Sequence, residues 1–328
     1  MAEKKIGQVI HRYVFSDMLE LFRMAPQDGS PFPEYKAGQY VALSRDNCKL
    51  TKKITEASGD LKYLYDVDES GKPKQGTVTH SYSISSAPYE TQEKGYLEFY
   101  VVLEMVETGL PGRLSESLFK IDPMNDSMIF YMNKIVGDFT LDKRAAGFEN
   151  VVMVGTGTGL APFASMIKQL HHDAIQGKGN SVKYTLFHAN RTYEELGYHQ
   201  ELLEIQAAQK FDFLYVPSVS RPAVRDYDDP TLGKGRGNNV LRSVFGMPLK
   251  EEQDIQETAA QGKDVSKMKQ ALEKTTRSML PKHLTTQKLL ERMEPSRTVI
   301  LTCGNPNVMD DIKYIADANK IKFEKEEW

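Results

Sequence analysis

Hydrophobic and polar positions follow two different periods along the chain, and the change falls near residue 145. Before it, β-branched and aromatic residues partly alternate with polar ones in short runs, a pattern that predicts β-strands. The clearest of these runs are 6–24, 37–43 and 96–103. Short strands at this spacing are typical of an antiparallel β-barrel.

From Val151 onward, buried strands alternate with amphipathic helices. The apolar run 151–154 predicts a strand of a parallel sheet, and apolar residues then recur at helical spacing from Ala164 to Ala174. Further strand candidates are 182–188, 213–219 and 298–303, and a helix is expected over 194–209. This alternation predicts an α/β fold with a parallel sheet and helices on both faces.

With 328 residues, the chain is long enough for about two domains. We place the boundary at the change of pattern, which gives a β-barrel domain over 1–145 and an α/β domain over 146–328. The second domain carries a charged, mostly helical insertion at about 249–292, whose apolar stripe is more typical of core packing than of a partner site. The stripe consists of Met268, Leu272 and Met279.

Composition excludes several classes of function. The net charge of -3, from Lys+Arg 42 and Asp+Glu 45, argues against a general nucleic-acid-binding protein. No apolar run approaches the ~20 residues of a membrane span, and the first residues lack the apolar core of a signal peptide, so we expect a soluble, cytoplasmic protein. Cys48 and Cys303 are too few for an iron–sulfur cluster, a zinc site or a disulfide framework. We therefore expect no metal site, and redox chemistry requires an organic cofactor.

A glycine-rich turn, Gly155-Thr156-Gly157-Thr158-Gly159, joins the strand at 151–154 to the following helix. Glycine lets backbone N–H groups approach a pyrophosphate, and the helix N-terminus adds unpaired donors and a partial positive charge. The third glycine comes two residues after the second, so the spacing departs from the dinucleotide fingerprint, which needs glycines at positions one, three and six. The turn therefore predicts a phosphate site, and a simple strand-to-helix turn is the alternative.

A series of short motifs, each weak by itself, occurs in the order found in the ferredoxin–NADP reductase family. The chain resembles this family along nearly its whole length. The motifs are Ala37-Gly38-Gln39-Tyr40, His80-Ser81-Tyr82-Ser83, Gly112-Arg113-Leu114-Ser115, Gly137-Asp138-Phe139, Gly155 to Phe163, Cys303-Gly304-Asn305-Pro306 and the aromatic Trp328. The resemblance implies an antiparallel FAD-binding β-barrel followed by a Rossmann-like NADP-binding domain.

The resemblance implies that FAD binds to the barrel domain. Tyr82 would stack on the flavin, Ser83 would hydrogen-bond near flavin N5, and Trp328 would cover the other face of the flavin, although a terminal aromatic residue can also simply pack against the fold. Ser115 would equally serve as the N-cap of a short helix over 115–119 without any ligand. The complete set of expected FAD contacts is His80, Tyr82, Ser83, Val101, Val102, Gly112, Arg113, Leu114, Ser115 and Trp328.

His80 stands where the family usually has arginine. Arginine grips a diphosphate with two parallel bonds and stays charged, whereas histidine, with an ordinary pKa of ~6.5, offers a contact that depends on pH. We therefore expect retention of FAD, measured by ultrafiltration, to weaken above about pH 7. Equal retention on both sides of this pH would contradict the expectation.

NADP(H) would bind to the second domain. The family implies contacts from Gly155, Thr156, Gly157, Thr158, Gly159 and Pro162, and on the nicotinamide side from Cys303, Gly304 and Pro306. Arg191, Arg221 and Arg236 follow successive strand candidates, at the strand ends where open α/β sheets bind ligands, and a 2′-phosphate requires such cations. Solvated surface arginines are the alternative. No acidic residue is obviously placed for the ribose 2′-hydroxyl, which would indicate NAD.

The resemblance also implies which residues take part in the chemistry: Ser83, Cys303, Glu326 and Trp328. Cys303 would help to orient hydride transfer, but a cysteine after a sheet strand is most often simply buried. Glu326 would relay protons in the family manner, and a frayed acidic tail over 324–328 is the simpler interpretation.

We interpret the chain as a ferredoxin/flavodoxin–NADP(+) reductase, a flavoprotein oxidoreductase of electron transport. It would transfer hydride between NADP(H) and FAD, and single electrons to or from an acidic carrier such as ferredoxin or flavodoxin. The lysine-bearing stretch 44–79 is expected to form a long hairpin, in which Lys49, Lys52 and Lys53 are candidates for docking the carrier. A reductase component of an oxygenase system and a non-catalytic nucleotide-binding subunit are the alternatives. The sequence gives no oligomeric state.

Overall fold

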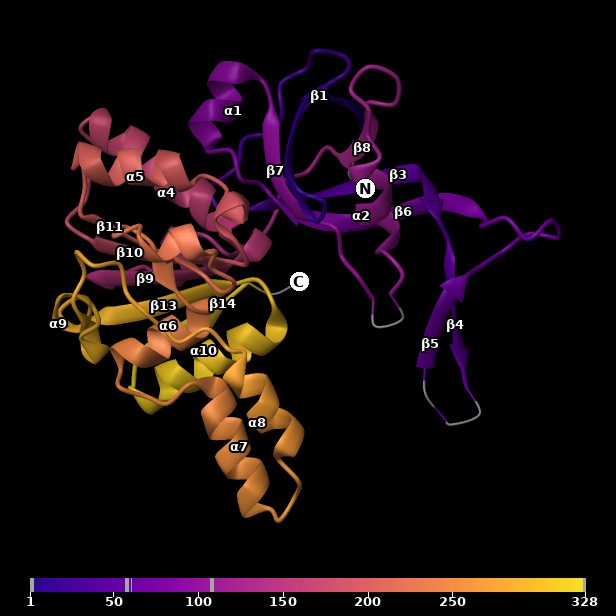
Figure 1. Ribbon diagram of the computed structural model, residues 1–328. Helices are drawn as coiled ribbons and strands as arrows, with labels where there is room; N and C mark the ends of the chain where they lie inside the picture. The colour runs from indigo at the N-terminus through magenta and orange to yellow at the C-terminus, as the bar shows by residue number, and fades with distance from the viewer. Residues whose placement is uncertain (1–2, 57–58, 60, 107–108, 327–328) are drawn as a thin grey trace. The chain divides into compact units, whose positions relative to one another are not determined.

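The computed structural model describes residues 3–326 except for 57–58, 60 and 107–108. The chain divides into two compact units, Met1–Asp138 and Phe139–Glu327, which are described separately below (Figure 1). The boundary at 138/139 lies a few residues before the one expected from the sequence at 145/146.

The first unit is built on an antiparallel sheet with the strand order β6-β3-β8-β1-β2-β7 among the described residues. Its strands are β1 (Lys4–Ser16), β2 (Leu19–Pro26), β3 (Tyr40–Lys49), β6 (Gln75–Ser83), β7 (Leu97–Val102) and β8 (Met128–Met132). The edge strands β6 and β7 approach each other at one end, where the Ser85 N–H donates to the Glu98 carbonyl at 2.9 Å. The sheet therefore curls into the antiparallel barrel that the sequence predicts.

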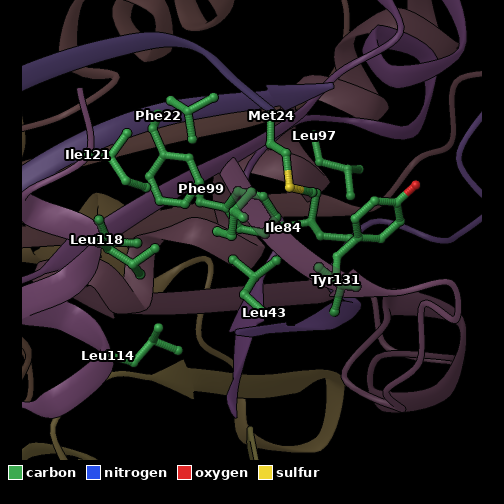
Figure 2. Close-up of a cluster of buried hydrophobic side chains, with 14 of the residues drawn as sticks. Phe22, Met24, Leu43, Ile84, Leu97, Phe99, Leu114, Leu118, Ile121 and Tyr131 are labelled. Atoms are coloured by element: carbon green, nitrogen blue, oxygen red, sulfur yellow. The ribbon is translucent and has the colours of Figure 1, made fainter. Parts of the chain in front are cut away.

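Side chains from the inner face of this sheet form one apolar core. Phe22, Met24, Leu43 and Phe99 are fully buried in it, and Figure 2 shows them beside residues of the other strands. Two short helices, α1 (Pro88–Lys94) and α2 (Arg113–Phe119), complete the unit, and α2 contributes Leu114 and Leu118 to the core. This packing fixes the loop that precedes α2.

The stretch between β3 and β6 forms a separate two-stranded antiparallel hairpin of β4 (Thr51–Thr55) and β5 (Leu61–Tyr65), which confirms the predicted excursion (Figure 1). Lys52 and Lys53 are exposed on β4. Lys49 is not on the hairpin: it ends β3, and its Nζ donates to Glu116 Oε1 at 2.7 Å. The placement of Lys49 on the hairpin is therefore wrong, and its role in docking a carrier stays a prediction.

The second unit contains a parallel sheet with the order β12-β11-β10-β9-β13-β14 among the described residues. Its strands are β9 (Asn150–Thr156), β10 (Lys183–Asn190), β11 (Phe213–Val219), β12 (Gly233–Lys234), β13 (Thr298–Cys303) and β14 (Lys322–Lys325). The order reverses between β9 and β13, and the carboxyl ends at such a reversal are where open α/β sheets bind ligands. This is the Rossmann-like arrangement that the sequence predicts.

Helices cover both faces of this sheet (Figure 1). The helices of this unit include α3 (Leu141–Arg144), α4 (Ala161–Ile175), α5 (His199–Ala208), α6 (Gly237–Val244), α9 (Thr286–Leu290) and α10 (Pro306–Ala318). The helix predicted from 194 begins only at His199, because Tyr198 adopts a left-handed conformation with φ of 61° and interrupts the chain. Residues 193–195 form a 3-10 turn instead.

The predicted insertion is a helical hairpin of α7 (Lys250–Ala260) and α8 (Ser266–Glu273), which protrudes from the unit in Figure 1. Met268 and Leu272 are half-buried on α8. Met279 lies after the helix and pairs with Lys234 in a β-bridge, so its assignment to the same helical stripe is wrong.

The helices of the described residues are all too short or too polar to cross a membrane. Within the same described part of the chain, no group of three or more His, Cys, Asp or Glu side chains is arranged to hold a metal ion.

Candidate functional site

In the first unit, Tyr82 lies on the edge strand β6. Its ring is half-buried against the barrel core, opposite Val41 of β3. Burial raises the pKa of the Tyr82 phenol, and the nearby Glu104 carboxylate raises it further. Tyr82 therefore keeps its proton at neutral pH and presents an uncharged ring. The adjacent Ser83 is buried, whereas His80 is exposed on the same strand.

The second part of the barrel site lies before and at the start of α2. We define the barrel site as Tyr82, Glu104, Gly112 and Ser115. A Cβ atom on Gly112 would lie 2.7 Å from Ser115 Oγ and 3.2 Å from Glu104 Oε2. Ser115 Oγ donates to the Gly112 carbonyl at 3.1 Å and accepts the Glu104 N–H at 3.3 Å. Only glycine fits in this cradle beside Ser115 and Glu104, and the family resemblance implies a phosphate near its backbone.

The structure corrects one expectation about the start of α2. α2 begins at Arg113 with Gly112 as its N-cap, so Ser115 lies inside the helix and is not the N-cap. The Leu114 side chain is 1% exposed in the core, which leaves only its backbone for a ligand. Sequence reasoning missed Glu104, because its approach to Tyr82 and Gly112 results from the path of the loop rather than from a local motif.

Val101 and Val102 end the edge strand β7. Val101 is buried in the core, while Val102 is half-buried. Among the described strands β7 pairs with β2, and at its other edge the Glu98 carbonyl accepts the Ser85 N–H at 2.9 Å. The backbone contacts to a ligand that the family resemblance implies for Val101 and Val102 stay a prediction.

In the second unit, the glycine-rich turn packs against the end of the neighbouring strand. A Cβ atom on Gly159 would lie only 2.1 Å from the Cys303 carbonyl oxygen, and one on Gly155 would lie 3.1 Å from Leu160 Cα. Gly157 has a φ of +56°, in the left-handed region. Residues 157–160, which include Thr158, form a 3-10 turn, and α4 then begins with Pro162 in its first turn. The third glycine thus serves contact with β13, which explains the unusual spacing.

Gly304 and Thr156 face each other across the reversal point. Gly304 has a φ of +129°, and a Cβ atom there would lie 2.6 Å from Thr156 Oγ1. Thr156 Oγ1 is buried and has no hydrogen-bond partner among the described residues. A buried hydroxyl without a partner favours the entry of a polar ligand atom. We define the crevice as 156–159 with Cys303 and Gly304, and these residues fit a nucleotide.

Cys303 and Glu326 form a buried pair beside the crevice. The Cys303 thiol donates to Glu326 Oε2 with a distance of 2.8 Å between Sγ and Oε2. Burial and the adjacent Glu326 carboxylate raise the pKa of Cys303 well above its usual value, so the thiol stays protonated. Glu326 is only 2% exposed, and its N–H donates to the Thr302 carbonyl, continuing the alignment of β14 with β13. The interpretation as a frayed tail is therefore wrong for residues 324–326, and residues 327–328 lie outside the described part of the chain.

Pro306, predicted on the nicotinamide side, and Trp328, predicted on the flavin, are the remaining expected contacts. Pro306 begins α10, behind Asn305, whose side chain caps the helix by accepting the Asn307 N–H at 3.0 Å. Trp328 lies outside the described residues.

The three predicted arginines all lie in loops at the carboxyl edge of the sheet. Arg191 forms a two-point ion pair with the buried Glu195. The Arg221 N–H donates to the Arg191 carbonyl at 2.7 Å, which joins the two loops, and the Arg221 side chain makes no ion pair within the described part of the chain. Arg236 is the N-cap of α6 and pairs with Glu251 at 3.0 Å.

Two curated proteins align with parts of the chain. A flavohemoprotein from Halalkalibacterium halodurans is 26% identical over 229 residues, which are 68% of this chain and 46% of that protein. A flavodoxin/ferredoxin–NADP reductase from Rhodobacter capsulatus is 29% identical over 147 residues, which are 45% of this chain and 47% of that protein. The chain thus spans about half the length of these curated relatives.

The fold is similar to solved structures over nearly its full length. A ferredoxin–NADP+ reductase from Neisseria gonorrhoeae, with bound FAD and NADP, matches with a TM-score of 0.57 and 19% identity over 99% of both chains. The family described as "Oxidoreductase NAD-binding domain" matches residues 153–236, a segment that begins in β9 and ends at Arg236. These findings confirm the fold class and the resemblance to ferredoxin–NADP reductases that the motifs indicate.

Proposed function

We propose that this relative of the ferredoxin–NADP reductases is itself a FAD-dependent NADPH reductase that exchanges single electrons with an acidic carrier protein. The observation that carries the proposal is the crevice at the reversal of the parallel sheet. There Gly159 packs on the Cys303 carbonyl and the Thr156 hydroxyl lacks a partner. The barrel site, with the Gly112 cradle and the Tyr82 ring, supports a second cofactor.

FAD, when bound, supplies the conversion between two-electron hydride transfer and single-electron transfer. The chain would hold it by stacking the uncharged Tyr82 ring, by the Ser83 hydroxyl, and by the backbone of the Gly112 loop. The side chain of Arg113, at the first position of α2, would add a positive charge near the pyrophosphate. His80 would contribute a weaker contact than the usual arginine.

NADP(H) would be bound by the crevice and oriented by the Cys303–Glu326 pair. The backbone of the glycine-rich turn would accept the pyrophosphate, and Arg191, Arg221 and Arg236 would recognise the 2′-phosphate. Because the Cys303 thiol keeps its proton, it would act as a neutral, fixed contact for the nicotinamide. Glu326 Oε2 accepts the hydrogen bond from that thiol.

A decisive test of this function is optical. The purified protein should be yellow and should lose its colour when NADPH is added without oxygen. It should then reduce a ferredoxin or a flavodoxin, and it should do so better with NADPH than with NADH. Protein that stays colourless after incubation with FAD, or that keeps its colour with both nucleotides, would contradict the proposal.

The match to a flavohemoprotein favours a second candidate, a reductase that supplies electrons to a haem or oxygenase partner. Both candidates share the flavin and nucleotide chemistry, so the loss of colour does not separate them. Parallel assays with ferredoxin, with flavodoxin and with a haem protein as the acceptor would separate them. The exposed Lys52 and Lys53 on β4 suit an acidic partner.

Replacing Glu326 by glutamine should lower kcat by about a hundredfold, because the charged acceptor beside the Cys303 thiol is lost while the volume is kept. The assay is NADPH-dependent reduction of ferricyanide, with the KM for NADPH little changed. Glu324→Gln is the matched control: Glu324 lies two residues before Glu326, on β14, but its carboxylate pairs with Arg144. Equal rates for the two variants would remove Glu326 from the chemistry.

A further inference from the structure

Two ion pairs join the first turn of the inserted helix α7 to arginines from two other segments. Arg236, at the start of α6, pairs with Glu251, with 3.0 Å between Nη1 and Oε1. Arg277, which follows α8, pairs with the neighbouring Glu252. Adjacent carboxylates on one helical turn therefore hold two arginines whose positions in the sequence are far apart.

The backbone brings the same two arginines to neighbouring positions. Lys234 and Met279 exchange two hydrogen bonds, of 2.8 Å and 2.9 Å, in an antiparallel bridge. Next to it, Gly235 has a φ of +107°, and a Cβ atom there would lie 3.1 Å from Ser278 Cα. One residue further along each antiparallel segment come Arg236 and Arg277, which this register places opposite each other.

The segment that carries Arg277 also touches the loop of a third arginine. The Thr276 hydroxyl donates to the Ser220 carbonyl at 2.7 Å, and Ser220 directly precedes Arg221. Residues 276–279 therefore contact both loops that carry Arg221 and Arg236. Sequence reasoning missed Arg277, because the insertion separates it from those loops in the chain.

The carboxylates are the fixed partners in this arrangement, and the guanidinium groups are the accessible ones. Glu251 Oε2 accepts from Asn239 Nδ2 at 2.8 Å, and the fully buried Asn239 also accepts the Lys250 N–H at 2.9 Å. The Glu251 side chain is 18% exposed, whereas those of Arg236 and Arg277 are 62% and 63% exposed. Each guanidinium has five N–H donors, so donors remain for a ligand.

The chemistry of this cluster matches a phosphate group. Ion pairs as exposed as these contribute little to stability, so a stabilising role is a poor explanation for the cluster. A phosphate accepts two parallel bonds from each guanidinium. Arginines that are already held in place lose less side-chain freedom when they bind it.

We propose that the α7–α8 insertion is a nucleotide-specificity element that supplies Arg277 to the 2′-phosphate of NADP(H), beside Arg236. Glu251 and Glu252 are positioning residues that hold the two guanidinium groups. This inference rests on the proposed function, and it adds a residue and a structural element to the three arginines that the family resemblance implies.

The test compares binding of adenosine 2′,5′-bisphosphate with that of adenosine 5′-monophosphate, measured by titration calorimetry on the full chain. Arg277→Ala should weaken binding of the bisphosphate about tenfold, the loss of one charge-assisted contact, and leave the monophosphate unchanged. Arg297→Ala is the matched control, since Arg297 is equally exposed and ion-paired but lies just before the amino end of β13. It should change neither affinity.

Separate variants test whether Glu251 positions the arginines. Glu251→Gln should weaken binding of the bisphosphate about threefold without changing binding of the monophosphate, and Glu251→Asp should restore part of the loss. In the loaded enzyme, Arg277→Ala should lower the ratio of kcat/KM for NADPH to that for NADH about tenfold. Tighter or unchanged binding of the bisphosphate by Glu251→Gln would overturn its positioning role.

The outcomes also separate this inference from the proposed function. If the unaltered protein prefers the bisphosphate but Arg277→Ala keeps that preference, the inference fails and the NADPH reductase proposal stands. If Arg277→Ala weakens both ligands equally, Arg277 has no specific role at the 2′-phosphate. If the unaltered protein shows no preference for the bisphosphate, the inference and the proposed NADP specificity fail together.

Discussion

Replacing Arg242 by alanine should lower the free energy of unfolding of the second unit by about 3–5 kcal/mol. Arg242 is completely buried, and its guanidinium pairs with the buried Asp311 of α10, with 2.9 Å between Nε and Oδ2. It also donates to the Pro248 carbonyl and to Gln253 at the base of the insertion. Alanine would leave the Asp311 carboxylate buried without its countercharge, which is the costly part of the change.

Urea unfolding followed by circular dichroism measures this effect, and a double variant provides the control. Arg242→Met combined with Asp311→Leu removes both charges and keeps most of the volume, so it should be clearly more stable than Arg242→Ala. A single variant that loses less than about 1 kcal/mol would show that the pair is not needed, since that is the scale of an exposed pair. A double variant that is no more stable than Arg242→Ala would show that the loss of stability comes from packing and not from the unpaired charge.

Gly159→Ala should abolish measurable binding of NADP+ and destabilise the second unit by about 3 kcal/mol. The new methyl group would meet the Cys303 carbonyl oxygen at 2.1 Å and the Gly304 nitrogen at 2.6 Å. Both are backbone atoms, so the glycine-rich turn or the end of β13 has to move. Either movement distorts the crevice at the point where the pyrophosphate and the nicotinamide would meet.

The neighbouring Gly157→Ala is the matched control for this substitution. A methyl group there meets no atom within 4 Å, and only the left-handed φ of +56° opposes it. This strain costs about 1–2 kcal/mol, and NADP+ should still bind. Titration calorimetry measures NADP+ binding by both variants, and thermal melting measures their stability. NADP+ binding by Gly159→Ala at the strength of Gly157→Ala would show that the close packing at Gly159 does not shape the crevice.

Elements with strong local patterns could be predicted from the sequence. The strands predicted at 213–219 and 298–303 are β11 and β13 with the same ends. Both lie inside a parallel sheet, so they are apolar on both faces, and the polar residues beyond them mark where they end. The antiparallel barrel could be predicted for a related reason, because its strands keep an alternating pattern.

Features that depend on residues far apart in the chain could not be predicted. Glu326 lies in an acidic segment that looks like a free tail, and it is buried only because β14 pairs with β13. The partners of Arg236 and Arg277 come from the insertion, whose charged sequence resembles an ordinary exposed helix. Glu104 approaches Tyr82 through the fold of its loop. In each case the environment of the residue is determined by a contact with a distant segment of the chain and not by the local sequence pattern.

The strand order of the second unit also has a consequence for the order of folding. β13 pairs directly with β9, yet residues 157–297 separate the two strands in the chain. Contacts between such distant segments carry a high entropic cost of loop closure and form slowly. During synthesis, β9, β10 and β11 leave the ribosome well before β13. We therefore expect the apolar strand β9 to stay exposed along the edge that β13 later covers. Until β13 pairs with β9, chaperones can bind to this exposed edge.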